Sequence, residues 1–160
     1  MKRGVFMVGA ISLLLVGVRP CAAQSADDTT AVAVSLFSHL RGELPEGPAA
    51  VDPEPFCTPR LVGWKCSERV RALADELGLS LNAREFTLIC TGGQGSCRLL
   101  AARSLVAFQD LEIDTRGGRA RVTASLWWRT GQGMSPVSYR QRRITLARNR
   151  QGWTVIDRGK

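Results

Sequence analysis

The segment from residue 105 to residue 157 alternates apolar and polar residues, the pattern of strands with one buried face. A turn at 115–118 lets Asp114 face Arg119, and the same register sets Glu112 opposite Arg121. The other face then pairs Ile113 with Ala120, Leu111 with Val122, Ala107 with Leu126 and Leu105 with Trp128, and only Gln109 opposite Ala124 interrupts it. Because a shift of one residue would bury the charges, charge and apolarity predict one register.

Two further strands are predicted after this hairpin, at 137–148 and 153–157. Val137 and Tyr139 occupy odd positions in the third strand, whereas Ile144 and Leu146 occupy even ones. Placing both pairs on the core face requires one extra residue near 141–143, so we expect a β-bulge there. The four strands together predict a curved antiparallel meander with one apolar face.

Two amphipathic helices are predicted before the meander and would cover its apolar face. The first spans residues 28–41, with Asp28 as a capping residue and Gly42 after its end; the second spans 68–77, with Ser67 as N-cap. Prolines at 45, 48, 53, 55 and 59 predict an irregular surface loop over 43–63. The sequence therefore predicts a single α+β domain over 24–160, with N-terminal helices packed on a cone-like β-meander.

The first 23 residues have the features of a secretory leader. A basic pair at residues 2–3 precedes an apolar run over 4–18, and small residues end at Ala23. The run is shorter than the roughly 18 residues that a membrane-spanning helix needs. We expect cleavage near Ala23 and export to the periplasm or the medium, with an uncleaved anchor as the alternative.

Export would place the remaining cysteines in an oxidising compartment, where an even number predicts two disulfides. Four cysteines allow three connectivities, and the short spacings favour Cys57–Cys66 and Cys90–Cys97. The second bridge would clasp a hairpin of residues 86–90 and 97–101 around a glycine-rich tip. A zinc site is the competing interpretation, but neither pair has C-x-x-C spacing and His39, the single histidine, is distant in sequence. We therefore expect no metal site.

Motifs along the C-terminal strands resemble those of the NTF2-like (SnoaL-like) superfamily. They are Ala120-Arg121-Val122, Trp127-Trp128, Arg143-Ile144-Thr145-Leu146 and Gly152-Trp153-Thr154-Val155. The resemblance implies a bent sheet wrapped around helices, with a pocket at its open end. That superfamily includes small-molecule isomerases and cyclases, ligand carriers and interaction domains, so the resemblance selects no activity.

An apolar pocket between the helices and the curved sheet is the first functional hypothesis. Its expected lining is Phe37, Leu105, Leu111, Val122, Leu126 and Trp128. Such a pocket suits a small hydrophobic ligand or an apolar side chain of a protein partner. The sequence therefore predicts an exported binding domain, and a homo-oligomer is compatible with that function.

The charge distribution supports a second hypothesis. The chain has a net charge of +8; residues 24–114 carry 8 basic and 13 acidic side chains, whereas residues 115–160 carry 11 basic and one acidic. Arginine suits bidentate contact with phosphate or carboxylate, so Arg121, Arg140 and Arg142, with Trp127 beside Arg140, predict an anion-binding sheet face. A polyanion or an anionic surface would be the partner, and no nucleic acid is expected outside the cell. The competing explanation is compositional, because arginine outnumbers lysine 19 to 3.

A small isomerase-type enzyme is the third hypothesis, and it requires His39 or Asp110 to face the pocket. His39 lies off the apolar stripe of the first helix. Asp110, Glu112 and Asp114 could hold calcium, but the arginines opposite them favour cross-strand ion pairs. The sequence contains no cofactor motif, so we expect no cofactor and favour a function other than catalysis.

Overall fold

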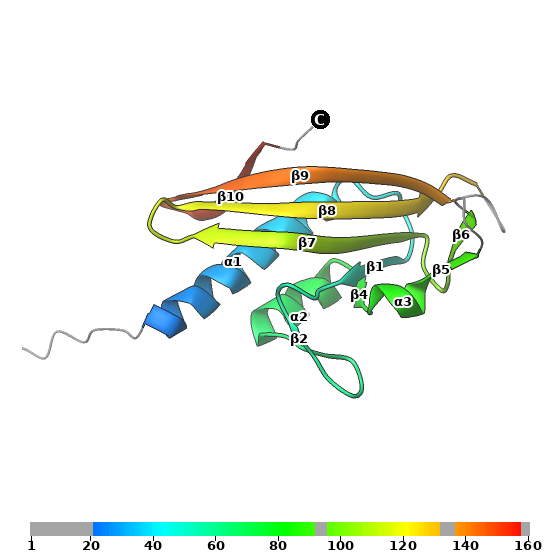
Figure 1. The fold of residues 1–160 in the computed structure, drawn as a ribbon, viewed down its shortest axis with the longest axis horizontal. Coiled ribbons are helices and arrows are strands. Elements are labelled where there is room, and N and C mark those ends of the chain that lie inside the picture. The colour runs from blue at the N-terminus through cyan, green and yellow to red at the C-terminus, as the bar shows by residue number, and fades with distance from the viewer. Residues whose placement is uncertain (1–20, 92–95, 132–136, 158–160) are drawn as a thin grey trace, which may run out of the picture.

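The computed structural model describes residues 21–91, 96–131 and 137–157. They form an α+β fold in which helices lie against a six-stranded, mostly antiparallel sheet (Figure 1). The predicted leader lies largely outside the described residues, as do the glycine-rich hairpin tip at 92–95 and the turn at 132–136.

The sheet has the strand order β10-β9-β8-β7-β1-β4. Its antiparallel part is the predicted meander: β7 (Ser104–Asp114), β8 (Arg119–Arg129), β9 (Val137–Asn149) and β10 (Gly152–Asp157). The remaining strands, β1 (Ala49–Asp52) and β4 (Leu79–Leu81), are parallel to each other, and β1 is parallel to β7. The sheet is therefore mixed at one side, which the meander pattern did not predict.

The proline-rich segment was wrongly predicted to be irregular throughout. Residues 49–52 contain no proline and form β1, a strand buried along its whole length. Pro48 and Pro53 lie immediately outside the two ends of β1, where a missing N–H does not interrupt the ladder. The prolines therefore delimit a short central strand.

The described residues before the meander form three helices: α1 (Cys21–Arg41), α2 (Glu68–Glu76) and the short α3 (Arg84–Thr87). α2 has the predicted N-cap, since the Val70 N–H donates to Ser67 Oγ at 3.3 Å. α1 begins before Asp28, so Asp28 is not its cap. The Asp28 carboxylate instead accepts a hydrogen bond from the Trp153 indole at 3.2 Å and pairs with Arg148 at 3.3 Å, which ties α1 to the end of the meander.

Two small hairpins lie outside the main sheet: β2 (Thr58–Pro59) with β3 (Trp64–Lys65), and β5 (Leu88–Thr91) with β6 (Ser96–Leu99). Each is closed by one of the two expected disulfides, Cys57–Cys66 and Cys90–Cys97. Such bonds persist in oxidising compartments, so the protein occupies an oxidising environment. Among the described helices, none is long and apolar enough to span a membrane.

The register of the long hairpin is confirmed next to its turn, where Asp114 faces Arg119 and Glu112 faces Arg121. A bulge then gives β7 two residues, Asp110 and Leu111, for one in β8. Asp110 takes a φ of 52°, a left-handed conformation that aspartate tolerates better than most residues. Beyond the bulge the predicted pairs are wrong, and the observed pairs are Gln109–Thr123, Phe108–Ala124, Ala107–Ser125, Val106–Leu126 and Leu105–Trp127.

The bulge predicted in β9 is also wrong, because β8 and β9 pair without interruption from Arg119–Ala147 to Arg129–Val137. The prediction assumed a single apolar face. In fact Ile144 is buried on the face of α1, whereas Val137 packs on the opposite face. Because both faces of the sheet carry apolar clusters, the odd-numbered and the even-numbered apolar residues of β9 can pack on opposite faces without an extra residue.

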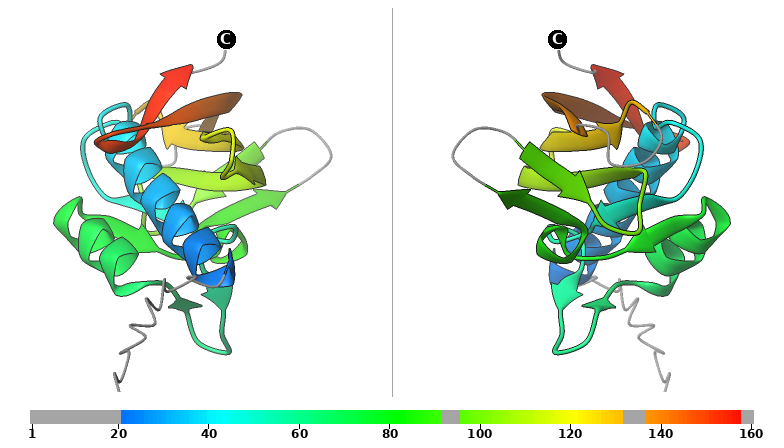
Figure 2. Two further views of the ribbon diagram at one scale, coloured as in Figure 1. Left: turned by 90° about the vertical axis from the view of Figure 1, so that its left-hand side faces the viewer. Right: turned by 90° about the vertical axis from the view of Figure 1, so that its right-hand side faces the viewer.

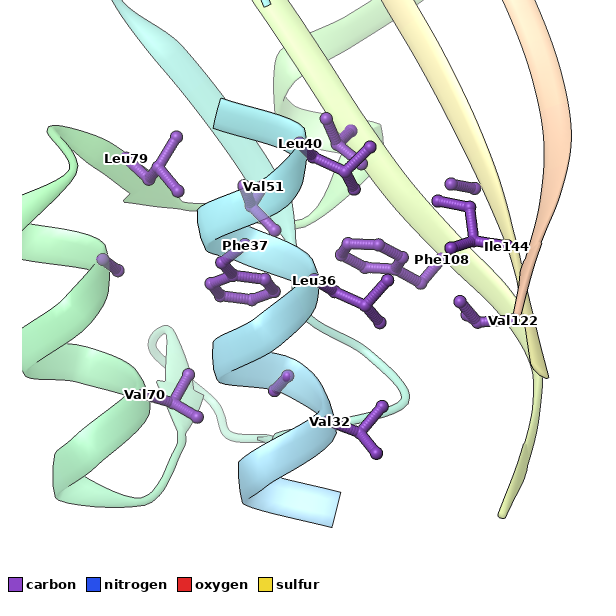
Figure 3. Packing of buried hydrophobic residues seen from close by; sticks show 14 of the residues in the cluster. Val32, Leu36, Phe37, Leu40, Val51, Val70, Leu79, Phe108, Val122 and Ile144 are labelled. Carbon is purple, nitrogen blue, oxygen red and sulfur yellow. The ribbon is translucent and has the colours of Figure 1, made fainter. Parts of the chain in front are cut away.

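The main core lies between α1, α2 and the sheet (Figure 3). Figure 3 shows Leu36 of α1 directed toward Phe108 and the sheet, with Val70 of α2 on the other side of α1. A smaller cluster covers part of the other face, where the β5–β6 hairpin contributes Leu99. Figure 2 shows α2 and this hairpin on opposite sides of the sheet.

Candidate functional site

The residues predicted to line an apolar pocket do not share one surface. The main core contains Phe37, Val122 and Leu126, with Leu111 and Trp128 partly buried against it, and the smaller cluster on the other face contains Leu105. The bulge in β7 accounts for this separation, because it moves Leu105 and Ala107 to the face opposite α1 and brings Val106 and Phe108 inward.

The space between α1 and the centre of the sheet is filled by aromatic rings. Phe37 stacks on Phe108 with ring centroids 5.8 Å apart, and Phe56 contacts Phe108 edge-on at 5.2 Å. The gap bordered by Phe37 and Phe108 in the described structure has no room for a water molecule. The interior is therefore a packed core, and a ligand site must be sought beyond it.

A pocket of about 270 Å³ lies beyond the C-terminal end of α1, and we call it the basic pocket. Its lining consists of Leu126 and Trp128 of β8, Arg140 and Arg142 of β9, and Glu43, Leu44 and Pro45 of the loop after α1. The structure thus brings together two of the predicted apolar residues and two of the predicted anion-binding arginines. The basic pocket combines an apolar surface with guanidinium groups.

The strand pattern explains why arginines point to this side of the sheet. Arg140 pairs with Leu126 and Arg142 pairs with Ala124, on the same face as the buried Ile144. α1 ends at Arg41, so no further helical turn covers this end of the sheet. The loop is anchored by the N–H groups of Glu43 and Leu44, which donate to the Leu40 carbonyl at 2.9 and 3.1 Å.

The two arginines of the basic pocket have different environments. Arg142 is nearly buried, with 7% of its side chain exposed, and it forms an ion pair with Glu43. The opposite oxygen of that carboxylate lies 3.1 Å from His39 Nε2. Arg140 is exposed and forms no ion pair with a residue that the structure describes. Arg140 is therefore the cation available to an incoming anion.

The third arginine of the predicted anion-binding set lies elsewhere. Arg121 pairs with Thr145 on the opposite face, where it borders a hollow of about 220 Å³ with Arg143, Asp110 and Glu112. Trp127 lies on that face as well, and its ring is 5.2 Å from that of Tyr139 rather than beside Arg140. The predicted three-arginine surface is thus divided between two faces.

The two residues considered for catalysis, His39 and Asp110, also lie apart from each other. His39 contacts Glu43 of the basic pocket but is not itself a lining residue, and Asp110 is on the other face of the sheet. Sequence reasoning missed Glu43, Leu44 and Pro45, because the proline-rich loop was expected to lie on the surface. The four-residue spacing of His39 and Glu43 was the available signal, since it places two residues on one side of a helix end.

No family model, curated protein or solved structure matches this chain. Function is therefore inferred from the chemistry of the pocket itself. Within the described residues, no group of three His, Cys, Asp or Glu side chains could hold a metal ion.

Proposed function

We propose that this protein is an exported binding domain whose basic pocket takes a small ligand with a carboxylate and a short apolar body. The observation that carries this proposal is the unpaired guanidinium of Arg140 beside Leu126 and Trp128. Arg140 would bind the carboxylate through two parallel N–H···O bonds. The leucine and tryptophan would cover the apolar part of the ligand.

The charge balance of the pocket favours one anionic group. Glu43 already neutralises Arg142, so Arg140 supplies the excess positive charge. A hydrogen bond to a charged group contributes about 1.5–3 kcal/mol, which corresponds to a roughly ten- to hundredfold change in affinity. The carboxylate should therefore distinguish this ligand from a neutral analogue of the same size.

Export and an NTF2-like relationship are parts of the same proposal. The two disulfides and the leader pattern over residues 1–23 support export. The consecutive pairing of β7 to β10 and the position of α1 against them support the NTF2-like resemblance. Mass spectrometry of the secreted protein should find an N-terminus close to Gln24; an intact Met1 would contradict cleavage.

Binding of a polyanion across the sheet receives less support. That function needs Arg121, Arg140 and Arg142 on one surface, whereas Arg121 lies on the opposite face near Asp110 and Glu112. Retention on heparin that weakens when all three arginines become glutamine would favour this alternative over the carboxylate pocket.

Calorimetric titration with hexanoate and with the neutral hexanol tests the proposal. Arg140→Gln should weaken hexanoate binding ten- to hundredfold and leave hexanol binding unchanged. Arg143→Gln is the matched control, because Arg143 is an exposed arginine of the same strand that faces the other side of the sheet. Trp128→Ala should weaken both ligands, since both would contact the indole.

Two results would overturn the proposal. One is hexanol binding as tightly as hexanoate to the unaltered protein. The other is equal hexanoate affinity in the Arg140→Gln and Arg143→Gln variants.

A further inference from the structure

A second and larger pocket, of about 360 Å³, lies at the C-terminal end of β1, and we call it the acidic pocket. Its walls include Trp64 and Leu61 of the β2–β3 hairpin, Phe86 of α3, and the carboxylates of Glu54 and Glu85. None of these residues belongs to the basic pocket. The binding proposed above therefore leaves the acidic pocket unexplained.

The topology of the sheet creates this crevice. β1 and β4 are parallel neighbours, so their carboxyl ends, at Asp52 and Leu81, meet at one edge. The chain leaving β1 leads to α2 on the α1 side, whereas the chain leaving β4 leads through α3 to the β5–β6 hairpin on the other side (Figure 2). In open α/β sheets, ligands bind at places where connections from parallel strands diverge in this way.

The walls of the acidic pocket are held by bonds within the chain itself. The Cys57–Cys66 disulfide closes the base of the β2–β3 hairpin, and the Arg60 N–H donates to the Gly63 carbonyl at 3.0 Å near its tip. The Asp52 carboxylate accepts hydrogen bonds from the backbone N–H groups of Glu54, at 3.2 Å, and Arg84, at 2.8 Å. A site ordered in advance spends less binding free energy on immobilising its own loops.

Apolar side chains are exposed around this pocket without a covering element. Leu61 is fully exposed at the hairpin tip, Val62 beside it is 88% exposed, and Phe86 is 76% exposed. The loop that carries the two aliphatic residues projects away from the body of the molecule (Figure 1). Gathered exposed apolar residues are typical of binding surfaces.

The charge of the lining selects the kind of ligand. Asp52, Glu54 and Glu85 are opposed by Arg60 as the one basic residue of the lining. Glu54 and Glu85 are exposed, and neither forms an ion pair with a described residue. This negative site in a chain of net charge +8 complements a cation.

We propose that the acidic pocket binds an organic cation with an apolar body, namely an ammonium or guanidinium group held by Glu54 and Glu85. The rings of Trp64 and Phe86 would contact the apolar part and attract the cation over their faces. The same chemistry is offered by a free amine and by a lysine or arginine side chain of a peptide. This site is independent of the proposed carboxylate binding, because the two pockets share no residue.

Calorimetric titration with phenethylamine, its neutral analogue 2-phenylethanol and the peptide acetyl-Leu-Lys-amide tests this inference on the full chain. The amine should bind at least tenfold more tightly than the alcohol. The double variant Glu54→Gln/Glu85→Gln should remove this tenfold preference. Glu76→Gln, at an exposed position on α2, is the control and should bind like the unaltered protein.

The two cationic probes identify the source of the ligand. Tighter binding of the peptide assigns the pocket to a basic segment of a partner protein, whereas tighter binding of phenethylamine assigns it to a free amine. The inference is overturned if the alcohol binds as well as the amine, or if the double variant keeps its amine affinity. Hexanoate binding in the same variant should be unchanged, so failure of this inference is distinguishable from failure of the proposed function.

Discussion

The basic and acidic pockets differ in how their residues are placed. Leu126, Trp128, Arg140 and Arg142 of the basic pocket lie on two paired strands, so the alternation of a β-ladder sets which side chains face inward. The acidic pocket is formed mainly by connecting segments, which a disulfide and side-chain hydrogen bonds hold in place. The first pocket therefore depends on sheet register, whereas the second depends on local crosslinks.

β1 connects the two pockets. The loop that enters β1 lines the basic pocket with Glu43, and the loop that leaves it lines the acidic pocket with Glu54. β1 is buried along its length, with Val51 in the main core and Ala50 in the smaller cluster. A change in the core should therefore affect both pockets, whereas a change in one connecting segment should affect one.

The largest effect is expected from Phe108→Ala, which changes the main core rather than the lining of either pocket. Phe108 is buried and contacts both Phe37 and Phe56. Truncation of such a ring costs about 3–5 kcal/mol of unfolding free energy. Urea denaturation should show this loss, and hexanoate and phenethylamine should both bind more weakly.

Phe86→Ala is the control for this change, because Phe86 is exposed and its loss should alter stability by less than about 0.5 kcal/mol. It should weaken phenethylamine binding alone. Equal destabilisation by the two alanine variants would contradict the assignment of Phe108 to the core.

The next largest effect is expected from removal of the Cys57–Cys66 disulfide, which should affect the acidic pocket and not the basic pocket. Replacing Cys57 and Cys66 by serine should cost about 2.5 kcal/mol of unfolding free energy, as expected from the entropy of a short closed loop. It should also abolish the preference for phenethylamine while leaving hexanoate binding intact. Thermal unfolding and calorimetry measure the two effects.

The second disulfide provides a matched control for the first. Cys90 and Cys97 are 7 residues apart, against 9 for Cys57 and Cys66, so the loop-closure entropy lost with either bridge is similar. The Cys90→Ser/Cys97→Ser variant should retain both ligands, since neither cysteine lines either pocket. Loss of amine binding in that variant would show that general destabilisation, rather than the hairpin, explains the result.

The sequence was sufficient to predict the parts of the fold in which local signals agree. The charged pairs Asp114–Arg119 and Glu112–Arg121, the N-cap Ser67 and both disulfides are confirmed. Each of these features involves residues close together in the chain, where spacing leaves few alternatives. The α+β fold followed from the helical and strand periodicities.

The errors arose where the sheet has two buried faces. Residues 105–108 are all buried, so their sequence shows no alternation from which to choose a face. The predicted pair Gln109–Ala124 indicated that the register was wrong, because it placed an amide among apolar residues. The bulge at Asp110 resolves that conflict by turning Gln109 to the exposed side.

The candidate sites were less predictable than the fold, because they depend on contacts between distant segments. The composition of β8 and β9 identified Leu126, Trp128, Arg140 and Arg142, but their convergence with Glu43 requires the position of α1. The acidic pocket was not predicted at all. It arises from the parallel pairing of β1 with β4, and these strands are too short to give a periodic signal.

A smaller effect is expected at a site remote from both pockets. Asp28→Ala removes the acceptor of the Trp153 indole and the partner of Arg148, at a cost of about 1–2 kcal/mol. Both ligands should bind with unchanged affinity, because Asp28 lines neither pocket. Asp27→Ala, on the exposed side of α1, is the control and should leave the denaturation midpoint within experimental error.

The smallest effect concerns the backbone of the β2–β3 hairpin. Gly63 adopts a φ of 73°, and a Cβ there would meet no atom within 4 Å, so Gly63→Ala introduces conformational strain without a clash. The left-handed conformation costs a non-glycine residue about 1 kcal/mol. Gly78, after α2, has a φ of 63° and the same open surroundings. Gly78→Ala should therefore lower the unfolding free energy by a similar amount without changing either ligand affinity.

Gly63→Ala should in addition weaken phenethylamine binding severalfold, because Gly63 lies between Leu61 and Trp64 in the wall of the acidic pocket. Identical amine affinity in the two alanine variants would mean that the hairpin tip takes no part in binding, and would confine recognition to Glu54, Glu85 and Phe86.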